Sequence, residues 1–277
     1  MNIEDAIKYG MDNLKEKDNP KNLSERLLKN LLNKDRQYLI INDKQILEEY
    51  IELEYINRVN KLKKGLPIQY ITKKQNFMGL EIYVDENVLI PQPDTETLVE
   101  EAIKIIKKEK FKEVLDLCTG SGAIGVSIAK YINDINVTMT DISNDAILIA
   151  KKNSKDNFVL NRCKFIKSDL FENINEQYDI IVSNPPYIET ETIKTLSKEV
   201  QNEPILALDG GLDGLDFYRK IILNVDKYLK NNGYLILEIG YNQKEKIEEI
   251  VKESNIFNQI CFKKDLQNID RIVILKK

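Results

Sequence analysis

The first 74 residues of this 277-residue chain carry apolar side chains at helical spacing. Apolar positions recur there every three or four residues, which predicts amphipathic helices. These helical stretches cover residues 3–14, 23–32 and 46–59. Gly65 and Pro67 end the pattern. We therefore expect residues 1–74 to form a small helical domain.

A short segment with a different pattern follows. Two β-like apolar runs flank Asp85-Glu86-Asn87, which predicts a β-hairpin. A rigid Pro-Gln-Pro turn comes next, and Asp94 or Thr95 can cap a helix over residues 96–108. We expect this hairpin and turn, at residues 75–95, to link two modules.

From residue 112 onward, apolar runs alternate with amphipathic stretches. The runs lie at residues 113–117, 136–141, 163–166, 178–183, 233–239, 257–262 and 270–275. Strands that alternate with helices are typical of βαβ units in a mostly parallel sheet. No helix separates the last two runs, so the final strand should be antiparallel. For residues 96–277 we predict an α/β fold with a seven-stranded, Rossmann-like sheet, the layout of S-adenosylmethionine-dependent methyltransferases.

Composition excludes several kinds of chemistry. The chain has no histidine, so a Ser-His-Asp triad, a histidine zinc site and an imidazole general base are excluded. Its three cysteines form no CxxC pair, so neither a disulfide framework nor a metal site is expected. There is no secretory signal pattern and no apolar run of the roughly 18–20 residues that a membrane span needs, so we expect a cytoplasmic protein. The net charge of −4 argues against a dedicated nucleic-acid binder.

The first candidate site follows the run at residues 113–117. Gly120, Gly122 and Gly125 lie where a strand should turn into a helix, and glycines there let a ligand approach the backbone. The same spacing matches the dinucleotide fingerprint, so a dinucleotide site stays open as an alternative. Asp116 favours a methyl donor that carries an amino acid, because a carboxylate there attracts an ammonium group and repels a pyrophosphate.

Acidic residues end the next two predicted strands. Asp141 can accept hydrogen bonds from both hydroxyls of a ribose, which suits a dinucleotide and S-adenosylmethionine alike. Its alternative role is to cap a helix, with Ser143 as the competitor. Asp169, followed by Leu170 and Phe171, can hold an adenine ring by its amino group and its face. A capped loop is the alternative there.

The most informative motif is Asn184-Pro185-Pro186-Tyr187, at the end of the fourth predicted strand. The prolines rigidify the loop and remove backbone donors, which leaves the Asn184 side-chain oxygen and the Pro185 carbonyl as acceptors. A planar NH2 group can donate to both, which orients its nitrogen and stabilises positive charge that develops on it. Tyr187 can stack on the flat target group. A simple turn is the alternative interpretation.

Together these motifs resemble the release-factor glutamine methyltransferase family (PrmC, also called HemK). The matching segments are residues 65–71, 77–80, 89–96, 182–188, 203–204, 207–215, 218–219 and 238–240, with the glycine loop. The helical N-terminal module, the proline-rich turn and residues 203–214 make the resemblance specific. Gln92 and Cys118 depart from the family, which usually has arginine at the first of these positions and often glycine at the second.

This resemblance implies methyl transfer from S-adenosylmethionine to the side-chain amide nitrogen (N5) of the glutamine in the Gly-Gly-Gln motif of class 1 peptide chain release factors. The cofactor, which leaves as S-adenosylhomocysteine, is expected to contact Asp116, Cys118, Thr119, Gly120, Ser121, Gly122, Asp141, Asp169, Leu170, Phe171 and Asn184. We expect Asn184, Pro185 and Tyr187 to be catalytic, and these three with Pro186 to bind the glutamine. Residues 1–74 are expected to dock the release factor.

Two other functions stay open at this point. An exocyclic-amine nucleic-acid methyltransferase would share the cofactor and the Asn-Pro-Pro-Tyr motif, but it should also show a basic groove. The one basic patch consists of Arg58, Lys61, Lys63, Lys64, Lys73 and Lys74, which a solvated helix face explains equally well. A dinucleotide-dependent dehydrogenase leaves Asn-Pro-Pro-Tyr unexplained. For residues 1–74, a structural appendage or a dimerisation unit is the alternative to docking.

Overall fold

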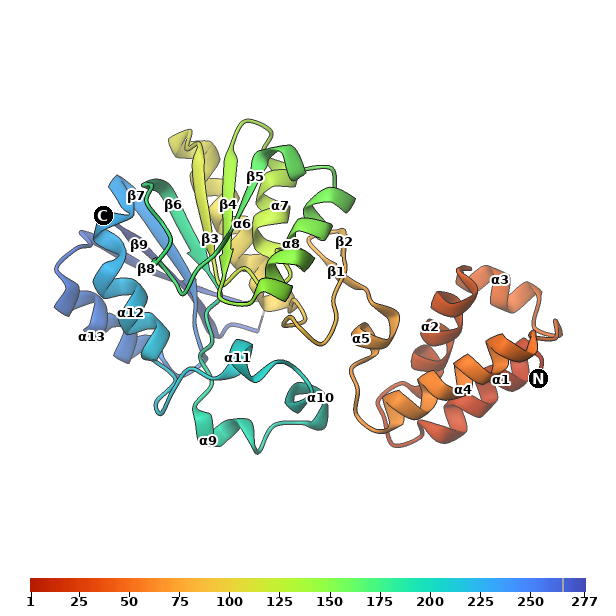
Figure 1. Cartoon of the computed structure of the whole chain (residues 1–277). Coiled ribbons are helices and arrows are strands. Elements are labelled where there is room, and N and C mark those ends of the chain that lie inside the picture. The colour runs from red at the N-terminus through yellow and green to blue at the C-terminus, as the bar shows by residue number, and fades with distance from the viewer. Residues whose placement is uncertain (266) are drawn as a thin grey trace. The chain divides into compact units, whose positions relative to one another are not determined.

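Five helices make up the first part of the chain in the computed structural model, which describes residues 1–265 and 267–277 (Figure 1). They are α1 (Ile3–Asn13), α2 (Pro20–Leu32), α3 (Arg36–Ile41), α4 (Glu49–Lys63) and α5 (Ile68–Thr72). Apolar side chains from α1, α2 and α4 are buried together in one core, as the spacing of apolar residues requires. The predicted helical domain is therefore confirmed.

The chain forms two compact units. Unit 1 consists of Met1–Lys74 with Ser197–Asn202, and unit 2 consists of Gln75–Leu196 with Glu203–Lys277. Within unit 1, Asn202 Nδ2 donates a hydrogen bond to the Gly65 carbonyl at 3.2 Å, and Lys17 forms an ion pair with Glu199. A six-residue segment from late in the sequence thus completes the helical unit.

The predicted hairpin is present, but its turn lies earlier than expected. Strands β1 (Gln75–Phe77) and β2 (Leu80–Ile82) pair antiparallel across Met78 and Gly79. Both turn residues have positive φ, 51° and 71°, as the tight turns of two-residue hairpins require. The expected turn at residues 85–87 was wrong, because Gly79 adopts this conformation without the steric cost that other residues pay.

Helix α6 (Pro93–Glu109) begins earlier than the sequence pattern predicted. Gln92 is its N-cap, and Pro93 occupies the first turn, where its fixed φ and missing N–H cost nothing. The expected caps, Asp94 and Thr95, therefore lie inside the first turn of α6 rather than before it.

Seven strands of unit 2 form one sheet in the order β5-β4-β3-β6-β7-β9-β8. The strands are β3 (Glu113–Leu117), β4 (Asn136–Asp141), β5 (Cys163–Lys167), β6 (Tyr178–Ser183), β7 (Leu229–Glu238), β8 (Gln259–Lys264) and β9 (Asp270–Lys276). Strands β3 to β7 pair in parallel, and β9 is antiparallel to both of its neighbours. This confirms the predicted α/β class and the reversed final strand.

Helices cover the two faces of this sheet (Figure 1). Helices α6, α7 (Ala123–Tyr131) and α8 (Asn144–Asp156) lie side by side, and α12 (Asp216–Asn224) packs against α13 (Lys244–Ser254). Side chains alternate along each strand, so Leu115 and Leu117 join the core with α12 and α13, while Asp116 points the other way, toward α7. Remaining short helices are α9 (Thr190–Ile193), α10 (Lys198–Gln201), α11 (Ile205–Leu208), η1 (Leu160–Arg162) and η2 (Val225–Lys227).

Gly10 provides a test of packing in unit 1. It is buried in the middle of α1, and a Cβ atom there would collide with Ser24 Oγ and Tyr55 Oη. Alanine has the better helix propensity by about 1 kcal/mol. Overpacking a filled core costs about 1–3 kcal/mol, however, and two hydroxyls must move. We expect Gly10→Ala to lower the free energy of unfolding by about 1–2 kcal/mol.

Urea unfolding followed by circular dichroism measures this difference. Lys8→Ala is the matched control, because Lys8 is exposed on the same helix and its replacement should change stability by less than about 0.5 kcal/mol. If Gly10→Ala were as stable as the wild type, α2 and α4 could move away from α1 without lowering the free energy of unfolding.

Candidate active site

The sheet brings three strand ends to one level. Leu117, the last residue of β3, pairs with Thr140 of β4 on one side and with Ser183 of β6 on the other. The strand order reverses between β3 and β6, and ligands of open α/β sheets bind at this kind of switch point. The loops after these strands are therefore where a site is expected.

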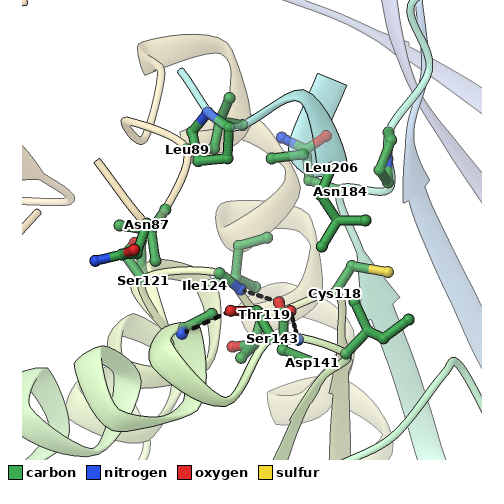
Figure 2. Close-up of a pocket in the computed structure, with 18 of the residues that line it drawn as sticks. Asn87, Leu89, Cys118, Thr119, Ser121, Ile124, Asp141, Ser143, Asn184 and Leu206 are labelled. Carbon is green, nitrogen blue, oxygen red and sulfur yellow. Dashed lines mark hydrogen bonds between the residues drawn. The ribbon is translucent and has the colours of Figure 1, made fainter. Parts of the chain in front are cut away.

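A pocket of about 340 Å³ lies at these loops, within the range of about 300–1,000 Å³ that is typical of small-molecule sites. Figure 2 shows Asn87 and Leu89 on one side of it, Asn184 and Leu206 on the other, and Asp141 below. The predicted site residues that line it are Cys118, Thr119, Gly120, Ser121, Asp141, Asp169, Leu170, Asn184 and Pro186. The structure thus brings together residues from four separate loops.

Of the described residues, five predicted site residues do not line this pocket: Asp116, Gly122, Phe171, Pro185 and Tyr187. Phe171 is buried and stacks on Tyr228, with ring centroids 4.4 Å apart. Phe171 therefore packs in the core, and of the two apolar residues after Asp169 only Leu170 faces the pocket.

The glycines of the first loop have different roles. A Cβ at Gly120 would meet nothing within 4 Å, so this position is open to a ligand. A Cβ at Gly122 would lie 2.9 Å from the Ala150 Cβ, so helix packing requires glycine there. Cys118 also has a positive φ, 56°, which explains why glycine suits this position. Burial raises the pKa of the Cys118 thiol, so it stays protonated near neutral pH.

Asp141 joins the first two loops. One of its oxygens accepts a hydrogen bond from the Gly120 N–H and the other from the Ser143 N–H, both at 2.9 Å. Burial raises the pKa of Asp141, and these backbone hydrogen bonds oppose the rise. Helix α8 is capped by the Ser143 hydroxyl, which accepts from the Ala146 N–H. The capping alternative for Asp141 was therefore wrong.

Asp116 lies beneath the glycine loop with no exposed surface. Its Oδ2 accepts hydrogen bonds from the Thr119 hydroxyl at 2.5 Å and from the Gly125 N–H at 3.0 Å. Its Oδ1 has no partner among the described residues, and burial raises its pKa to about 7. In this structure Asp116 holds the loop against the start of α7, one layer behind the pocket.

The Asn-Pro-Pro-Tyr motif presents two free acceptors. Asn184 Nδ2 donates to the Thr95 hydroxyl at 3.2 Å, which turns the amide oxygen of Asn184 away from α6. No described residue donates a hydrogen bond to this oxygen or to the Pro185 carbonyl. Both oxygens are therefore open to a hydrogen-bond donor.

Later segments of the chain brace this motif from behind. A Cβ at Gly210 would lie 2.7 Å from the Tyr187 Cα. A Cβ at Gly214, where φ is 71°, would come even closer to the Tyr187 carbonyl oxygen. Gln243 Nε2 donates to the carbonyls of Tyr187 and Gly214 at 3.0 and 3.1 Å, while its Oε1 accepts from the Gly240 N–H at 2.8 Å. These contacts explain why the 207–215 segment is rich in glycine.

Neither a membrane span nor a metal site is found among the described residues. None of the helices in residues 1–265 and 267–277 is long and apolar enough to span a membrane. Over the same residues, no group of three or more acidic or cysteine side chains is placed to hold a metal ion.

A release factor glutamine methyltransferase from Clostridium acetobutylicum is 43% identical to this chain over 280 positions, which cover 99% of this chain and 98% of the relative. The chain belongs to the release factor glutamine methyltransferase family. The PrmC N-terminal domain matches residues 5–72, and the methyltransferase small domain matches residues 95–212. S-adenosylmethionine is accordingly the methyl donor, and the protein is an enzyme.

A relative with another named substrate and a solved structure match less of the chain. A ribosomal protein uL3 glutamine methyltransferase from Francisella tularensis is 43% identical, over 71% of this chain and 63% of the relative. A methyltransferase structure from Pyrococcus furiosus has a TM-score of 0.53 at 19% identity, over 80% of this chain and 98% of the other. The structural likeness shows the fold.

The sequence pattern gave several residues around the pocket no role at the site. Phe217 and Lys220, one turn apart on α12, line the pocket, and so do Leu206 of α11 and Thr95 of α6. Gln243 holds the loop from outside. Only Thr95 lies in a segment that resembles the methyltransferase family, residues 89–96, and none of the five residues belongs to a motif with chemistry of its own.

The missing arginine at position 92 leaves no acid unpaired nearby. Gln92 is exposed, and Asp94 instead pairs with Arg271 of β9 at 3.3 Å. Glu96 accepts a hydrogen bond from the Met78 N–H at 2.6 Å. A residue from the end of the chain thus supplies the positive charge beside the proline-rich turn.

Glu203 joins two walls of the pocket. Its carboxylate accepts a hydrogen bond from the Ile90 N–H at 2.9 Å, which ties residues 203–207 to the turn at residues 89–91. The side chain is 7% exposed, and burial raises its pKa to about 7 from 4.5. Between pH 4.5 and 7 Glu203 is therefore protonated in the folded protein but ionised in the unfolded chain. The contribution of Glu203 to the free energy of unfolding is fully present below pH 4.5 and is lost as the pH rises to 7.

We expect Glu203→Gln to remove this pH dependence. Glutamine keeps an acceptor for Ile90 but never ionises. Between pH 4.5 and pH 8 the variant should gain about 1–3 kcal/mol of unfolding free energy relative to the wild type. Urea unfolding at the two pH values measures it, with Glu172→Gln at an exposed position as control. The prediction is contradicted if the difference in unfolding free energy between variant and wild type is the same at pH 4.5 and at pH 8.

Proposed function

We propose that this protein transfers a methyl group from S-adenosylmethionine to the side-chain amide nitrogen of the glutamine in the Gly-Gly-Gln motif of class 1 peptide chain release factors, in the cytoplasm. The observation that carries the proposal is the pair of unoccupied acceptors, Asn184 Oδ1 and the Pro185 carbonyl, on a rigid loop of which Asn184 and Pro186 line the pocket. A primary amide offers the two donors that such a pair needs.

The pocket fits the donor molecule. When bound, S-adenosylmethionine supplies an electrophilic methyl group. Gly120 leaves open space beside a loop whose backbone a ligand can approach, and Asp141 places a carboxylate within the same wall for ribose hydroxyls. Asp169 and Leu170 offer a carboxylate and an apolar face for the adenine ring. We assign the cofactor to these residues together with Cys118.

The acceptor pair also accounts for the chemistry. Asn184 and Pro185 hold both hydrogens of the target NH2, so the nitrogen is oriented toward the methyl group. Positive charge that develops on the nitrogen is stabilised by the same two oxygens. The proton leaves after the methyl group has been transferred, when the nitrogen has become acidic. No base is needed before attack, which suits a chain without histidine.

Other NH2 substrates would fit the same acceptors. An exocyclic amine of a nucleic acid is one, and the glutamine of a ribosomal protein is another, since one relative is named for uL3. Release factor is favoured because relatives with that name match the whole chain, including the N-terminal domain. The basic patch gives little support to nucleic acid, because Arg58 is paired with Glu54.

Incubation with labelled S-adenosylmethionine and each of these substrates tests the proposal. We expect label in release factor, lost when the Gly-Gly-Gln glutamine is replaced. Label in DNA, RNA or uL3 alone would overturn the choice of substrate.

Binding and turnover should separate at two residues. We expect Asp141→Asn to weaken S-adenosylmethionine binding by about 1.5–3 kcal/mol, since one charge-assisted acceptor becomes neutral. Asn184→Ala should lower kcat by about 100-fold or more, the scale for losing an electrostatic contact made in the transition state, with cofactor affinity nearly unchanged. Calorimetry and single-turnover kinetics measure the two effects.

Asp145→Ala is the control for the first change, because Asp145 is exposed four residues further along and lies outside the pocket lining. Wild-type turnover in Asn184→Ala would exclude Asn184 from catalysis, and wild-type cofactor affinity in Asp141→Asn would exclude Asp141 from cofactor binding.

Unit 1 offers a surface for docking a protein substrate. A single glutamine is too small to be selected among all others, so a second contact area is needed, and specific interfaces bury about 1,200–2,000 Å² in total. Five large apolar side chains between residues 40 and 53 are at least 61% exposed: Ile40, Ile41, Ile46, Tyr50 and Leu53. So many in one short stretch are typical of an interaction surface. We propose that these residues help to dock the release factor.

Replacing Tyr50 and Leu53 by alanine in the full chain tests this role. The pair lies three residues apart on α4, and both side chains are exposed, so folding should not change. We expect kcat/KM on intact release factor to fall at least about tenfold, or 1.4 kcal/mol. Activity on a short Gly-Gly-Gln peptide, which lacks the rest of the release factor, should stay the same.

Leu148→Ala, at an exposed position of α8, is the control and should affect neither substrate. Deleting residues 1–74 addresses the same point, but it also removes the partners of Ser197–Asn202. If both the double variant and a folded deletion methylate intact release factor normally, unit 1 is an appendage or a dimerisation unit.

A further inference from the structure

One buried amide side chain outside the pocket connects two segments of the pocket wall. Asn153 lies in the second half of α8 and has no exposed surface. Its Nδ2 donates hydrogen bonds to the Ser121 carbonyl at 2.8 Å and to the Tyr83 carbonyl at 2.9 Å. Its Oδ1 accepts one from the Tyr83 N–H at 2.7 Å. Ser121 belongs to the glycine loop, whereas Tyr83 directly follows β2, so Asn153 joins two parts of the chain that are distant in sequence.

The hydrogen-bonding groups of asparagine match this position completely. Two backbone carbonyls need donors, and the amide NH2 has two hydrogens to donate. One backbone N–H needs an acceptor, which the amide oxygen supplies. An aspartate carries at most one donor even when protonated, so it would leave at least one carbonyl without a partner. All the hydrogen-bonding capacity of Asn153 is therefore used to hold backbone in place.

Close packing brings Asn153 to the glycine loop. Ala150 lies three residues earlier on the same face of α8, and a Cβ at Gly122 would lie 2.9 Å from the Ala150 Cβ. Because Gly122 has no side chain, the helix can lie this near to the loop. The Ser121 carbonyl then comes within hydrogen-bonding distance of Asn153 Nδ2. Packing and hydrogen bonding together hold α8 and the glycine loop against each other.

Tyr83 begins the segment that forms another part of the pocket wall. Its hydroxyl donates a hydrogen bond to Asp85 Oδ2 at 3.2 Å. Asp85 Oδ1 in turn accepts from the Asn87 N–H at 3.0 Å and from Asn87 Nδ2 at 2.9 Å. Residues 86–89 all line the pocket, and Figure 2 shows Asn87 and Leu89 at its edge. A series of hydrogen bonds thus runs from Asn153 to this part of the wall.

We propose that Asn153 is a positioning residue for S-adenosylmethionine, because it holds the glycine loop and residues 86–89 at the spacing that the bound cofactor requires. Both segments line one pocket, and Gly120, where a ligand has open space, is the neighbour of Ser121. This inference rests on the proposed placement of the cofactor in this pocket, but not on the identity of the methyl acceptor. Loss of the Asn153 amide should therefore weaken binding of the cofactor and leave recognition of the acceptor unchanged.

Asn153→Asp and Asn157→Ala form a matched pair for the test. Aspartate has nearly the size of asparagine but lacks its two donors. Asn157 lies one turn later on α8, and its side chain bonds the Glu81 carbonyl at 3.2 Å and its own helix. We expect calorimetry on the full chain to show a Kd for S-adenosylmethionine raised at least about tenfold in Asn153→Asp. The Kd should change less than about twofold in Asn157→Ala.

Steady-state kinetics separates positioning from a general loss of stability. Partial unfolding divides the affinity by the folded fraction, so a variant that is more than half folded loses less than about twofold in this way. Unfolding also lowers the apparent kcat. We expect Asn153→Asp instead to raise the KM for S-adenosylmethionine in step with its Kd. The KM for the methyl acceptor should change less than about twofold.

Tyr83→Phe supplies a second arm that should not disturb folding, because the side chain is partly exposed. It removes the hydroxyl that bonds Asp85 but keeps the backbone groups that Asn153 holds. We expect the Kd for S-adenosylmethionine to rise about threefold, the scale of one weak hydrogen bond. If Asn153→Asp does not fold, an unchanged Kd in Tyr83→Phe overturns the inference.

Three results with a folded Asn153→Asp would also overturn it: a wild-type Kd, an equal rise in Asn157→Ala, or a KM for the methyl acceptor that rises as much as the KM for the cofactor. The kinetic assay uses whichever acceptor the wild type methylates. A wild type that labels an acceptor other than release factor therefore overturns the proposed function alone, and the cofactor measurements still decide the role of Asn153.

Discussion

The parallel register of β3 with β4 and with β6 is the constraint on which the site depends. It places Leu117, Thr140 and Ser183 at one level, so three loops leave the sheet side by side. The glycine loop, Asp141 and Asn184 then surround one pocket although they are far apart in the sequence. Because each loop starts from a buried, hydrogen-bonded strand, its position is set by the sheet rather than by the loop itself.

Three carboxylates at the pocket are buried. Asp116, Glu203 and Glu238 each lie within or behind a wall of the pocket, and burial raises the pKa of all three to about 7. Their hydrogen-bond donors are backbone N–H groups and hydroxyls, which hold each carboxylate without neutralising it. Acceptors of this kind hold the loops that surround the pocket.

The segments that brace the Asn-Pro-Pro-Tyr motif come from three later parts of unit 2: the loop at residues 210–214, the end of β7 and the start of α13. Gly210 and Gly214 lie against the backbone of the motif. Gln243 donates a hydrogen bond to the Tyr187 carbonyl, and Glu238 accepts one from the Tyr187 hydroxyl. Two prolines remove backbone donors from the motif, so side chains from elsewhere must hold it. The motif is therefore rigid because several elements converge on it, and not because of its own sequence alone.

The sequence by itself determined the fold class, the ends of β3, β4 and β6, and the family. Periodicity marks buried faces, and glycines and prolines mark turns, so β3, β4 and β6 and the motifs after them were predicted from local pattern. Local pattern could not place the hairpin turn at Gly79 or the start of α6, because small differences between competing caps and turns decide such boundaries. Nor could it find the contacts of Thr95, Glu238 and Gln243, since partners more than 50 residues apart meet only after the sheet has formed.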